Sequence, residues 1–111
     1  MFRSALLVCT ILTATNTHAE GQYKTFGAGV KSCGDFVKSK GSMRNLYVQW
    51  ILGFLTAMDV RDVVASGKDS AMPLEASVNA YELWMDNYCK GHALESVANA
   101  AINLYFEVKK K

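Results

Sequence analysis

The stretch YELWMDNYCKGHAL, residues 81–94, carries the signals that decide the fold. Its apolar side chains recur at helical spacing as far as Cys89, and the KGH that follows breaks the pattern. Far upstream, KSCGDF (residues 31–36) places Cys33 in the first turn of another predicted helix, for which Ser32 is the expected cap. A bridge between the two cysteines would therefore clip a short leading helix to the end of a later one.

Residues 1–19 have the layout of a secretory signal peptide. Arg3 precedes an apolar run over residues 5–12, and small or polar residues follow up to Ala19. The run is far shorter than the roughly 20 residues that a membrane-spanning helix needs. We therefore expect export to the periplasm, cleavage before Glu20 and no membrane association of the mature protein.

Without this segment, Cys33 and Cys89 are the two cysteines of an exported chain of about ninety residues. An even pair of cysteines in a small exported domain favours a disulfide. In the loop-entropy relation, a bridge that closes a loop of about 57 residues stabilises the folded state by roughly 4 kcal/mol. That contribution is large beside the total of about 5–15 kcal/mol that is typical of domains.

Hydrophobic periodicity predicts an all-α domain, a compact bundle of four helices joined by short connections. Signals for β-strands are nearly absent. The first helix is expected to follow Ser32 and to end at Gly41. The third is expected to begin at Pro73, because proline is favoured at the first helical position. The fourth carries an apolar stripe from Leu94 to Tyr105.

The second predicted helix, at about residues 43–65, is the longest and the most apolar. Its apolar sector is so broad that we expect neighbours to cover it from more than one side. Gly53 inside it suggests the close approach of another helix. The expected apolar face consists of Leu46, Trp50, Ile51, Phe54, Leu55, Met58 and Val60.

The charge of the chain argues against nucleic acid as a partner. The formal net charge is +2, and it falls to +1 without Arg3, whereas nucleic-acid-binding domains carry a strong, clustered basic excess. We divide the mature chain into a flexible segment at residues 20–29, a single helical domain at residues 30–108 and a basic tail at residues 109–111.

With the helices placed, three motifs become recognisable: SCGDF (32–36), WILGFLTAMD (50–59) and WMDNYCKGHAL (84–94). Together they resemble a family of small exported bacterial proteins with the patterns S-C-x-x-aromatic, W-x-x-G-[FY]-[LI]-[ST]-A and W-x-x-x-Y-C-x-x-N-P-L. The family includes immunity proteins of the Rap/Tai kind, which neutralise type VI secretion effectors in the periplasm. The layout is also similar to that of HdeA-type periplasmic acid-stress chaperones. The resemblance extends over residues 29–104.

The resemblance implies the same disulfide, between Cys33 and Cys89. The chain departs from the family pattern where Asp59 stands in place of Asn, and where His92 and Ala93 replace Asn-Pro. His92 is a poorer helix cap than Asn, which leaves the start of the last helix open. The positions that match the core signature of the family are Trp50, Gly53, Phe54, Ala57, Trp84 and Tyr88.

Few residues suggest catalysis or metal binding. A reactive thiol needs a free cysteine beside a base, and Cys89 lies three residues from His92. We favour the simpler interpretation, a disulfide and a surface histidine. One histidine and two cysteines make a poor ligand set for zinc, so we expect neither a metal nor a cofactor.

Three carboxylates are candidates for a polar site. Asp59 and Asp62 lie at positions i and i+3 of the second helix, and Asp86 lies on the third. Charged residues on the outer face of an amphipathic helix are usually only solvated, and we favour that interpretation. Trp50 and Trp84 either line a ligand groove or belong to the core, and their helical spacing favours the core.

These observations favour a periplasmic binding protein without a catalytic role. By resemblance, we expect an immunity protein that neutralises a toxic effector through a protein–protein interface. The alternative is an HdeA-like acid-stress chaperone, in which protonation of carboxylates exposes apolar surface to client proteins. A small hydrolase or redox protein is a more remote third class. A homodimer is also expected of so small and apolar a unit.

Overall fold

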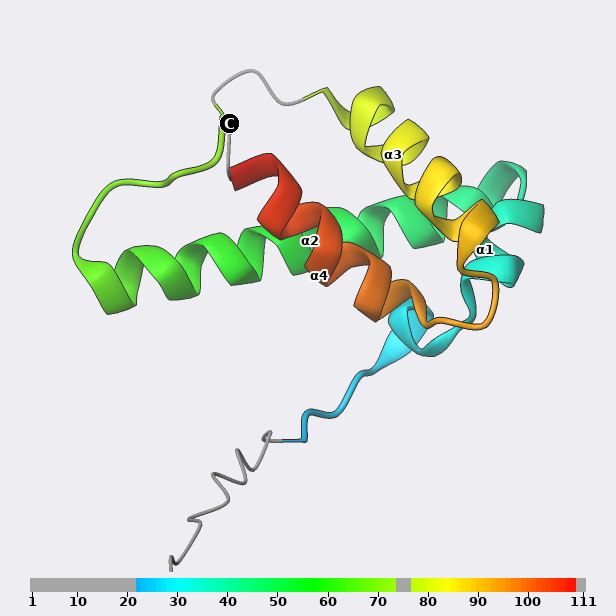
Figure 1. The fold of residues 1–111 in the computed structure, drawn as a ribbon, viewed down its shortest axis with the longest axis horizontal. Helices are drawn as coiled ribbons and strands as arrows, with labels where there is room; N and C mark the ends of the chain where they lie inside the picture. The colour runs from blue at the N-terminus through cyan, green and yellow to red at the C-terminus, as the bar shows by residue number, and fades with distance from the viewer. Residues whose placement is uncertain (1–21, 74–76, 110–111) are drawn as a thin grey trace, which may run out of the picture.

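The computed structural model describes residues 22–73 and 77–109. Within these ranges, a short 3-10 helix and four α-helices form the regular structure, without a β-strand (Figure 1). The predicted all-α class with four helices is confirmed, whereas the predicted signal peptide at residues 1–19 lies outside the described residues. The elements are η1 (Gly27–Val30), α1 (Cys33–Lys38), α2 (Gly41–Ser66), α3 (Val78–Gly91) and α4 (Val97–Lys109).

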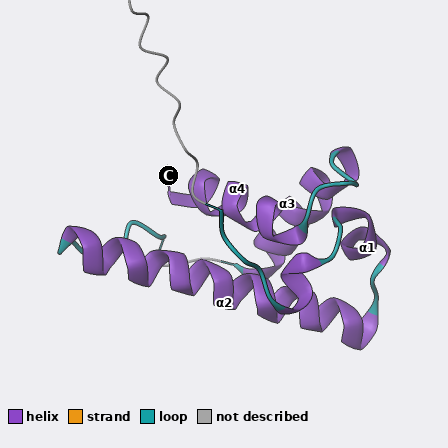
Figure 2. Ribbon diagram, turned by 90° about the horizontal axis from the view of Figure 1, so that it is seen from below, coloured by secondary structure: helices purple, strands orange, loops and turns teal. Residues whose placement is uncertain are grey.

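The long helix α2 lies along one side of the molecule. Figure 2 shows α1, α3 and α4 on the same side of it, and in Figure 1 its C-terminal end extends beyond the other helices. Among the described helices, none combines the length and the apolar character that crossing a bilayer requires.

Serine hydroxyls determine where α1 and α4 begin. The Ser32 hydroxyl accepts a hydrogen bond from the backbone N–H of Asp35 at 3.1 Å, which confirms the predicted start of α1. The Ser96 hydroxyl accepts one from the N–H of Asn99 at 3.1 Å, and α4 begins after Ser96. Leu94 therefore lies in the preceding connection with its side chain fully exposed. The predicted apolar stripe is wrong at this residue.

Helix α3 begins later than predicted. The Ser77 hydroxyl accepts a hydrogen bond from the N–H of Ala80 at 3.4 Å, and α3 starts at the residue after Ser77. Pro73 is exposed and lies outside the helices. Just before it, the Ser70 hydroxyl accepts the N–H of Met72 at 3.1 Å, a local contact that competes with helix formation. The predicted helix start at Pro73 is therefore wrong.

The core lies between α1, α3, α4 and the inner face of α2. Tyr47, which the sequence did not single out, is buried with its ring edge-on to Phe36 at 5.6 Å between centroids. Leu46 and Val60 were predicted for the apolar face, but both are exposed, so the prediction is wrong at these two residues. The buried core comprises Cys33, Phe36, Tyr47, Ile51, Leu55, Met85, Cys89, Val97, Ala98, Ala100, Ala101, Leu104 and Tyr105.

The six positions of the family signature divide into two groups. Gly53 and Ala57 are exposed, and a Cβ added to Gly53 would find no neighbouring atom within 4 Å. The expected core role and the expected close approach of another helix are therefore wrong at these two positions, since they lie on the uncovered face of α2. The half-buried group that packs against the core consists of Trp50, Phe54, Trp84 and Tyr88.

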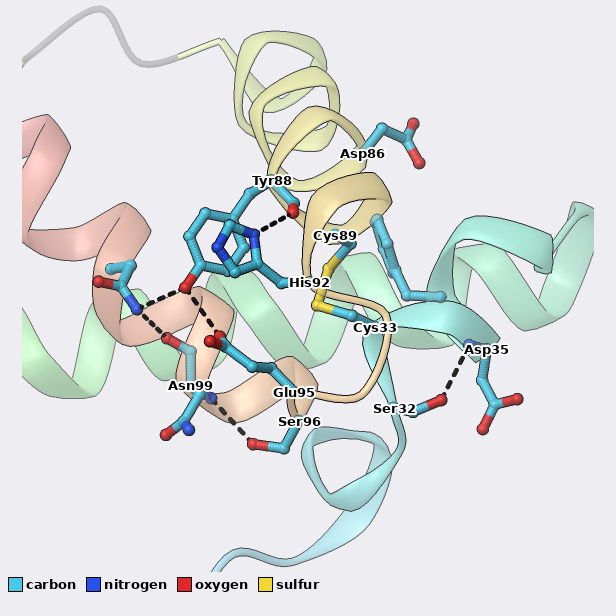
Figure 3. Close-up of a disulfide and its surroundings, with 12 residues drawn as sticks. Ser32, Cys33, Asp35, Asp86, Tyr88, Cys89, His92, Glu95, Ser96 and Asn99 are labelled. Atoms are coloured by element: carbon cyan, nitrogen blue, oxygen red, sulfur yellow. Dashed lines mark hydrogen bonds between the residues drawn. A yellow bond between two sulfur atoms is a disulfide. The ribbon is translucent and has the colours of Figure 1, made fainter.

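A disulfide joins Cys33 to Cys89, as predicted. It connects the first turn of α1 to the last turn of α3, with 4.7 Å between the two Cα atoms and both side chains fully buried (Figure 3). Backbone hydrogen bonds reinforce this junction. The N–H of Cys33 donates to the carbonyl of Glu95 at 2.7 Å, and the N–H of Val97 donates to the carbonyl of Lys31 at 2.8 Å. The short leading helix is thereby fixed to the ends of both α3 and α4.

Arg44, in the first turns of α2, connects this helix to α1 and α3. Its guanidinium donates to Asp86 at 3.0 Å and lies 4.1 Å from the centre of the Phe36 ring. It also donates to the backbone carbonyls of Val37 and Ser39, both at 3.3 Å, at the end of α1. The side chain is only 14% exposed, so these partners replace the water that a cation otherwise keeps. Asp86 thus belongs to an ion pair within the fold.

Candidate binding groove

An open apolar groove runs between α2, α4 and the segment that precedes η1. Its volume is about 620 Å³, within the range of roughly 300–1,000 Å³ that is typical of ligand sites. On α2, Trp50, Phe54 and Met58 follow one another at one-turn spacing and form its floor. The full lining is Tyr23, Lys24, Thr25, Phe26, Trp50, Phe54, Met58, Arg61, Ile102 and Phe106.

Trp50 anchors the N-terminal wall of the groove. Its indole Nε1 donates to the carbonyl of Phe26 at 2.8 Å, and its ring lies against Gly29. A Cβ at Gly29 would come within 2.1 Å of that ring, so the contact requires glycine. Further upstream, the hydroxyl of Tyr23 donates to Oδ1 of Asn99 on α4 at 2.6 Å. These contacts hold the segment from Tyr23 to Gly29 against the helices.

The aromatic side chains of the groove remain accessible. Phe26 and Phe106 are exposed, and the half-buried rings of Trp50 and Phe54 stack at 5.3 Å between centroids. Contiguous exposed apolar surface is typical of interaction sites, and aromatic residues are enriched at binding hot spots. Of the two interpretations of the tryptophans, groove lining applies to Trp50, whereas Trp84 lies outside the lining.

The charged residues of the groove lining are Lys24 and Arg61, both cationic. Arg61 comes about one turn after Met58 on α2, and its exposed guanidinium pairs with Asp62 at 2.9 Å. Among the described residues that line the groove, none carries a carboxylate. The groove therefore combines an apolar floor with a positive rim, and this combination suits an apolar segment that carries an acidic group.

Asp62 joins α2 to α4 beside the groove. The hydroxyl of Tyr105 donates to its Oδ2 at 2.5 Å, and the ammonium of Lys109 donates to the same oxygen at 3.0 Å. The hydrogen bond from Tyr105, followed by those from Lys109 and Arg61, holds the pKa of Asp62 far below its usual range. Burial, followed by the hydrogen bond to Asp62, raises the pKa of Tyr105 to about 12. We call this contact between Asp62, Tyr105 and Lys109 the α2–α4 clasp.

The structure brings two of the three candidate carboxylates together. Asp59 and Asp62 line a polar depression of about 360 Å³ near the C-terminal end of α2, and Asp86 is not part of it. Asp59 accepts a hydrogen bond from the hydroxyl of Ser70 at 2.8 Å. Each carboxylate has its own partner within the fold, since Asp86 pairs with Arg44.

Cys89 and His92 are engaged in contacts within the fold. The sulfur of Cys89 is bonded to Cys33, so Cys89 does not offer His92 a free thiol. The His92 ring stacks on Tyr88 at 4.0 Å between centroids, with Nδ1 2.7 Å from the carbonyl oxygen of Tyr88 (Figure 3). The Tyr88 hydroxyl donates to Glu95 at 2.7 Å. In the described part of the chain, no group of three or more His, Cys, Asp or Glu side chains is arranged to hold a metal ion.

The groove was not predicted because its walls come from three separate segments. Phe26 and Phe106 were not among the predicted sites, although both are exposed lining residues. Two weak signals mark them in the sequence: Phe106 follows Ile102 at one-turn spacing, and Phe26 is an aromatic residue ahead of the first helix.

Comparisons of the chain with protein-family models, with curated proteins and with solved structures found no match.

Proposed function

We propose that this chain is a periplasmic binding protein of the immunity type, which neutralises a toxic effector by docking onto it without catalysis. The observation that carries the proposal is the accessible aromatic groove on a braced helical scaffold. Trp50, Phe54 and Phe106 offer large, rigid contact area of the kind that dominates protein–protein binding energy. The resemblance of the cysteine and tryptophan motifs to Rap/Tai-type immunity proteins supports the same class.

The scaffold around the groove is pre-organised. The clasp between Asp62 and Tyr105 joins α2 to α4, which carry two of the groove walls, and Trp50 holds the third wall. The disulfide fixes α1 to α3 on the other side of the bundle. A pre-organised surface loses little conformational entropy on binding and so reaches a higher affinity for the same contacts. Such affinity is what the neutralisation of a toxin requires.

The groove fits an amphipathic helix of the effector. From Trp50 to Arg61, α2 rises by about 16 Å, or about three helical turns. A docked helix of that length presents apolar side chains at positions i, i+4 and i+7 to the aromatic floor. An acidic residue about one turn beyond these anchors would meet Arg61, and Lys24 supplies a second cation.

The test uses the product of the gene next to the one that encodes this chain. We expect its export to the periplasm of a host lacking both genes to stop growth, and co-expression of this chain to restore it. Phe106→Glu should weaken binding of the purified product by about a hundredfold, because the new carboxylate enters an apolar contact. Leu83→Glu, the matched change at an exposed position outside the groove lining, should bind like the wild type.

Two results would contradict the proposed function. One is a neighbouring product that neither arrests growth nor binds this chain. The other is equal binding by Phe106→Glu and the wild type, which would show that the groove is not the docking site.

An acid-stress chaperone is the second candidate, and the α2–α4 clasp is the observation that favours it. Protonation of Asp62 removes the acceptor that Tyr105 and Lys109 share and so loosens α4 from α2. The pKa of Asp62 is lowered in the folded protein. The stability that the clasp contributes is therefore fully present above the ordinary pKa of a carboxyl group, and it is lost as the pH falls toward the lowered pKa. A chaperone should bind an apolar dye and suppress client aggregation as the pH falls from about 4 to about 2. A chain that does neither lacks this function.

A further inference from the structure

The outward face of α2 is apolar, and the described residues leave it exposed. Leu46, Val60 and Val64 are 61%, 55% and 78% exposed, and Gly53 and Ala57 between them are exposed as well. Every residue of α2 is described, and none of these five positions carries a charged or polar side chain. In Figure 2 the other helices lie on one side of α2. We call these five residues the α2 seam.

The seam has the spacing with which two helices pack side by side. Successive seam residues are separated by 7, 4, 3 and 4 positions, which follows the heptad pattern of paired helices. A helix that is apolar on its outer face is typical of a buried position. At about 100° per residue, the centre of the seam is about a quarter turn from Phe54, and none of the five seam residues belongs to the groove lining.

The seam is complementary to a second copy of itself that runs in the opposite direction. About a twofold axis at the level of residue 55, Gly53 of one copy faces Ala57 of the other, and Leu46 faces Val64. The small residues meet at the centre, where the helices approach most closely, and the larger side chains pack on either side of it. We propose that two copies of this chain associate through antiparallel contact of their α2 seams.

Charge placement within α2 agrees with this contact. The charged residues of this helix lie off the seam, so the pairing buries none of them at the centre of the contact. The charged residues of this helix are Arg44, Asp59, Arg61 and Asp62.

The size of the seam determines the strength of the pairing. From Leu46 to Val64 the helix rises by about 27 Å, and a strip about 10 Å wide in each copy buries on the order of 500 Å² in total. Stable complexes bury more, at least about 1,200 Å². We therefore expect a weak dimer with a dissociation constant on the order of a hundred micromolar.

Sedimentation equilibrium of the purified, oxidised protein from about 1 µM to about 1 mM tests the pairing. The wild type should change from monomer to dimer across this range. Ala57→Glu should raise the dissociation constant by about a hundredfold, because a carboxylate then enters the centre of the apolar contact. Leu83→Glu on α3 should behave like the wild type, and circular dichroism confirms that each variant is folded. A wild type that stays monomeric at about 1 mM, or an Ala57→Glu variant that dimerises equally well, overturns the proposal.

Cross-linking tests the orientation. A mixture of Leu46→Cys and Val64→Cys chains should form a mixed disulfide dimer on mild oxidation, whereas each variant alone should not cross-link. Self-linking of Leu46→Cys alone indicates a parallel pair and overturns the antiparallel arrangement, as does a mixture that dimerises without cross-linking. These readouts do not involve the groove, so they stand or fall separately from the effector assay.

Discussion

The substitutions Gly29→Ala and Gly53→Ala place the same methyl group in opposite environments. At Gly29 the added Cβ would lie 2.1 Å from the Trp50 ring. That ring donates a hydrogen bond to the Phe26 carbonyl at 2.8 Å and stacks on Phe54 at 5.3 Å, so it cannot move without losing both contacts. At Gly53, inside α2, the added Cβ would have no neighbour within 4 Å.

The two substitutions should therefore change stability in opposite directions. Overpacking typically destabilises by about 1–3 kcal/mol, and we expect Gly29→Ala to lower the free energy of unfolding by about 2 kcal/mol. Gly53→Ala should raise it by about 0.5–1 kcal/mol, because alanine favours the helix and meets no obstacle. At about 4–8 °C per kcal/mol for a domain of this size, the melting temperatures of the two variants should differ by at least about 10 °C.

Thermal unfolding followed by circular dichroism measures this difference, at low micromolar concentration where the α2 seam is mostly unpaired. Tryptophan fluorescence supplies a second readout, because only Gly29→Ala should displace the Trp50 ring. A Gly29→Ala variant with wild-type stability and fluorescence would refute the contact between Trp50 and Gly29, and the groove would lose the support of one wall. A destabilised Gly53→Ala variant would refute the open environment of that residue.

Three further predictions concern contacts that hold the helices together. Replacing Cys33 and Cys89 by alanine should lower the free energy of unfolding in urea by roughly 4 kcal/mol, and equal stability would show that the bridge does not constrain the unfolded chain. Tyr105→Phe should reduce the pH dependence of the free energy of unfolding at both acidic and alkaline pH, and an unchanged pH dependence would contradict the clasp. On the acid limb, the lowered pKa of Asp62 gives stability that is full above about 3.8 and is lost as the pH falls. On the alkaline limb, the raised pKa of Tyr105 gives stability that is full below 10.0 and is lost as the pH rises toward about 12. Arg44→Met should lower the free energy of unfolding by about 2–3 kcal/mol because it leaves a half-buried carboxylate without its cation, and a loss under about 0.5 kcal/mol would contradict that role.

The features that were predicted well depend on residues close together in the sequence or on the number of cysteines. The Ser32 cap depends on a hydrogen bond three residues away. The bridge between Cys33 and Cys89 follows from the even pair of cysteines that remains once the predicted signal peptide is removed. The start of α3 was missed because proline suits a turn as well as a first helical position, and the competing cap at Ser77 was not weighed against Pro73.

The groove was harder to predict because it depends on tertiary contacts. Nothing near Gly29 in the sequence indicates that the Trp50 ring packs on it, and nothing near Asp62 indicates that Tyr105 donates to it from another helix. Both contacts join segments far apart in the chain. The same limit applies to Arg44, whose four partners lie on α1 and α3 or next to α1.

The apolar pattern of helix α2 is wider than the side of it that the described helices cover. Its broad apolar sector predicted cover from more than one side, yet the described helices cover one side, the groove opens on a second and the seam on a third. Apolar side chains such as Val64 contribute little to the stability of a chain in which they are exposed. If the groove binds an effector and the seam binds a second copy, each apolar side of α2 has an occupant. A polar substitution in the seam should then leave the melting temperature of the monomer nearly unchanged and weaken only the association of two copies, since the seam side chains are exposed in the single chain.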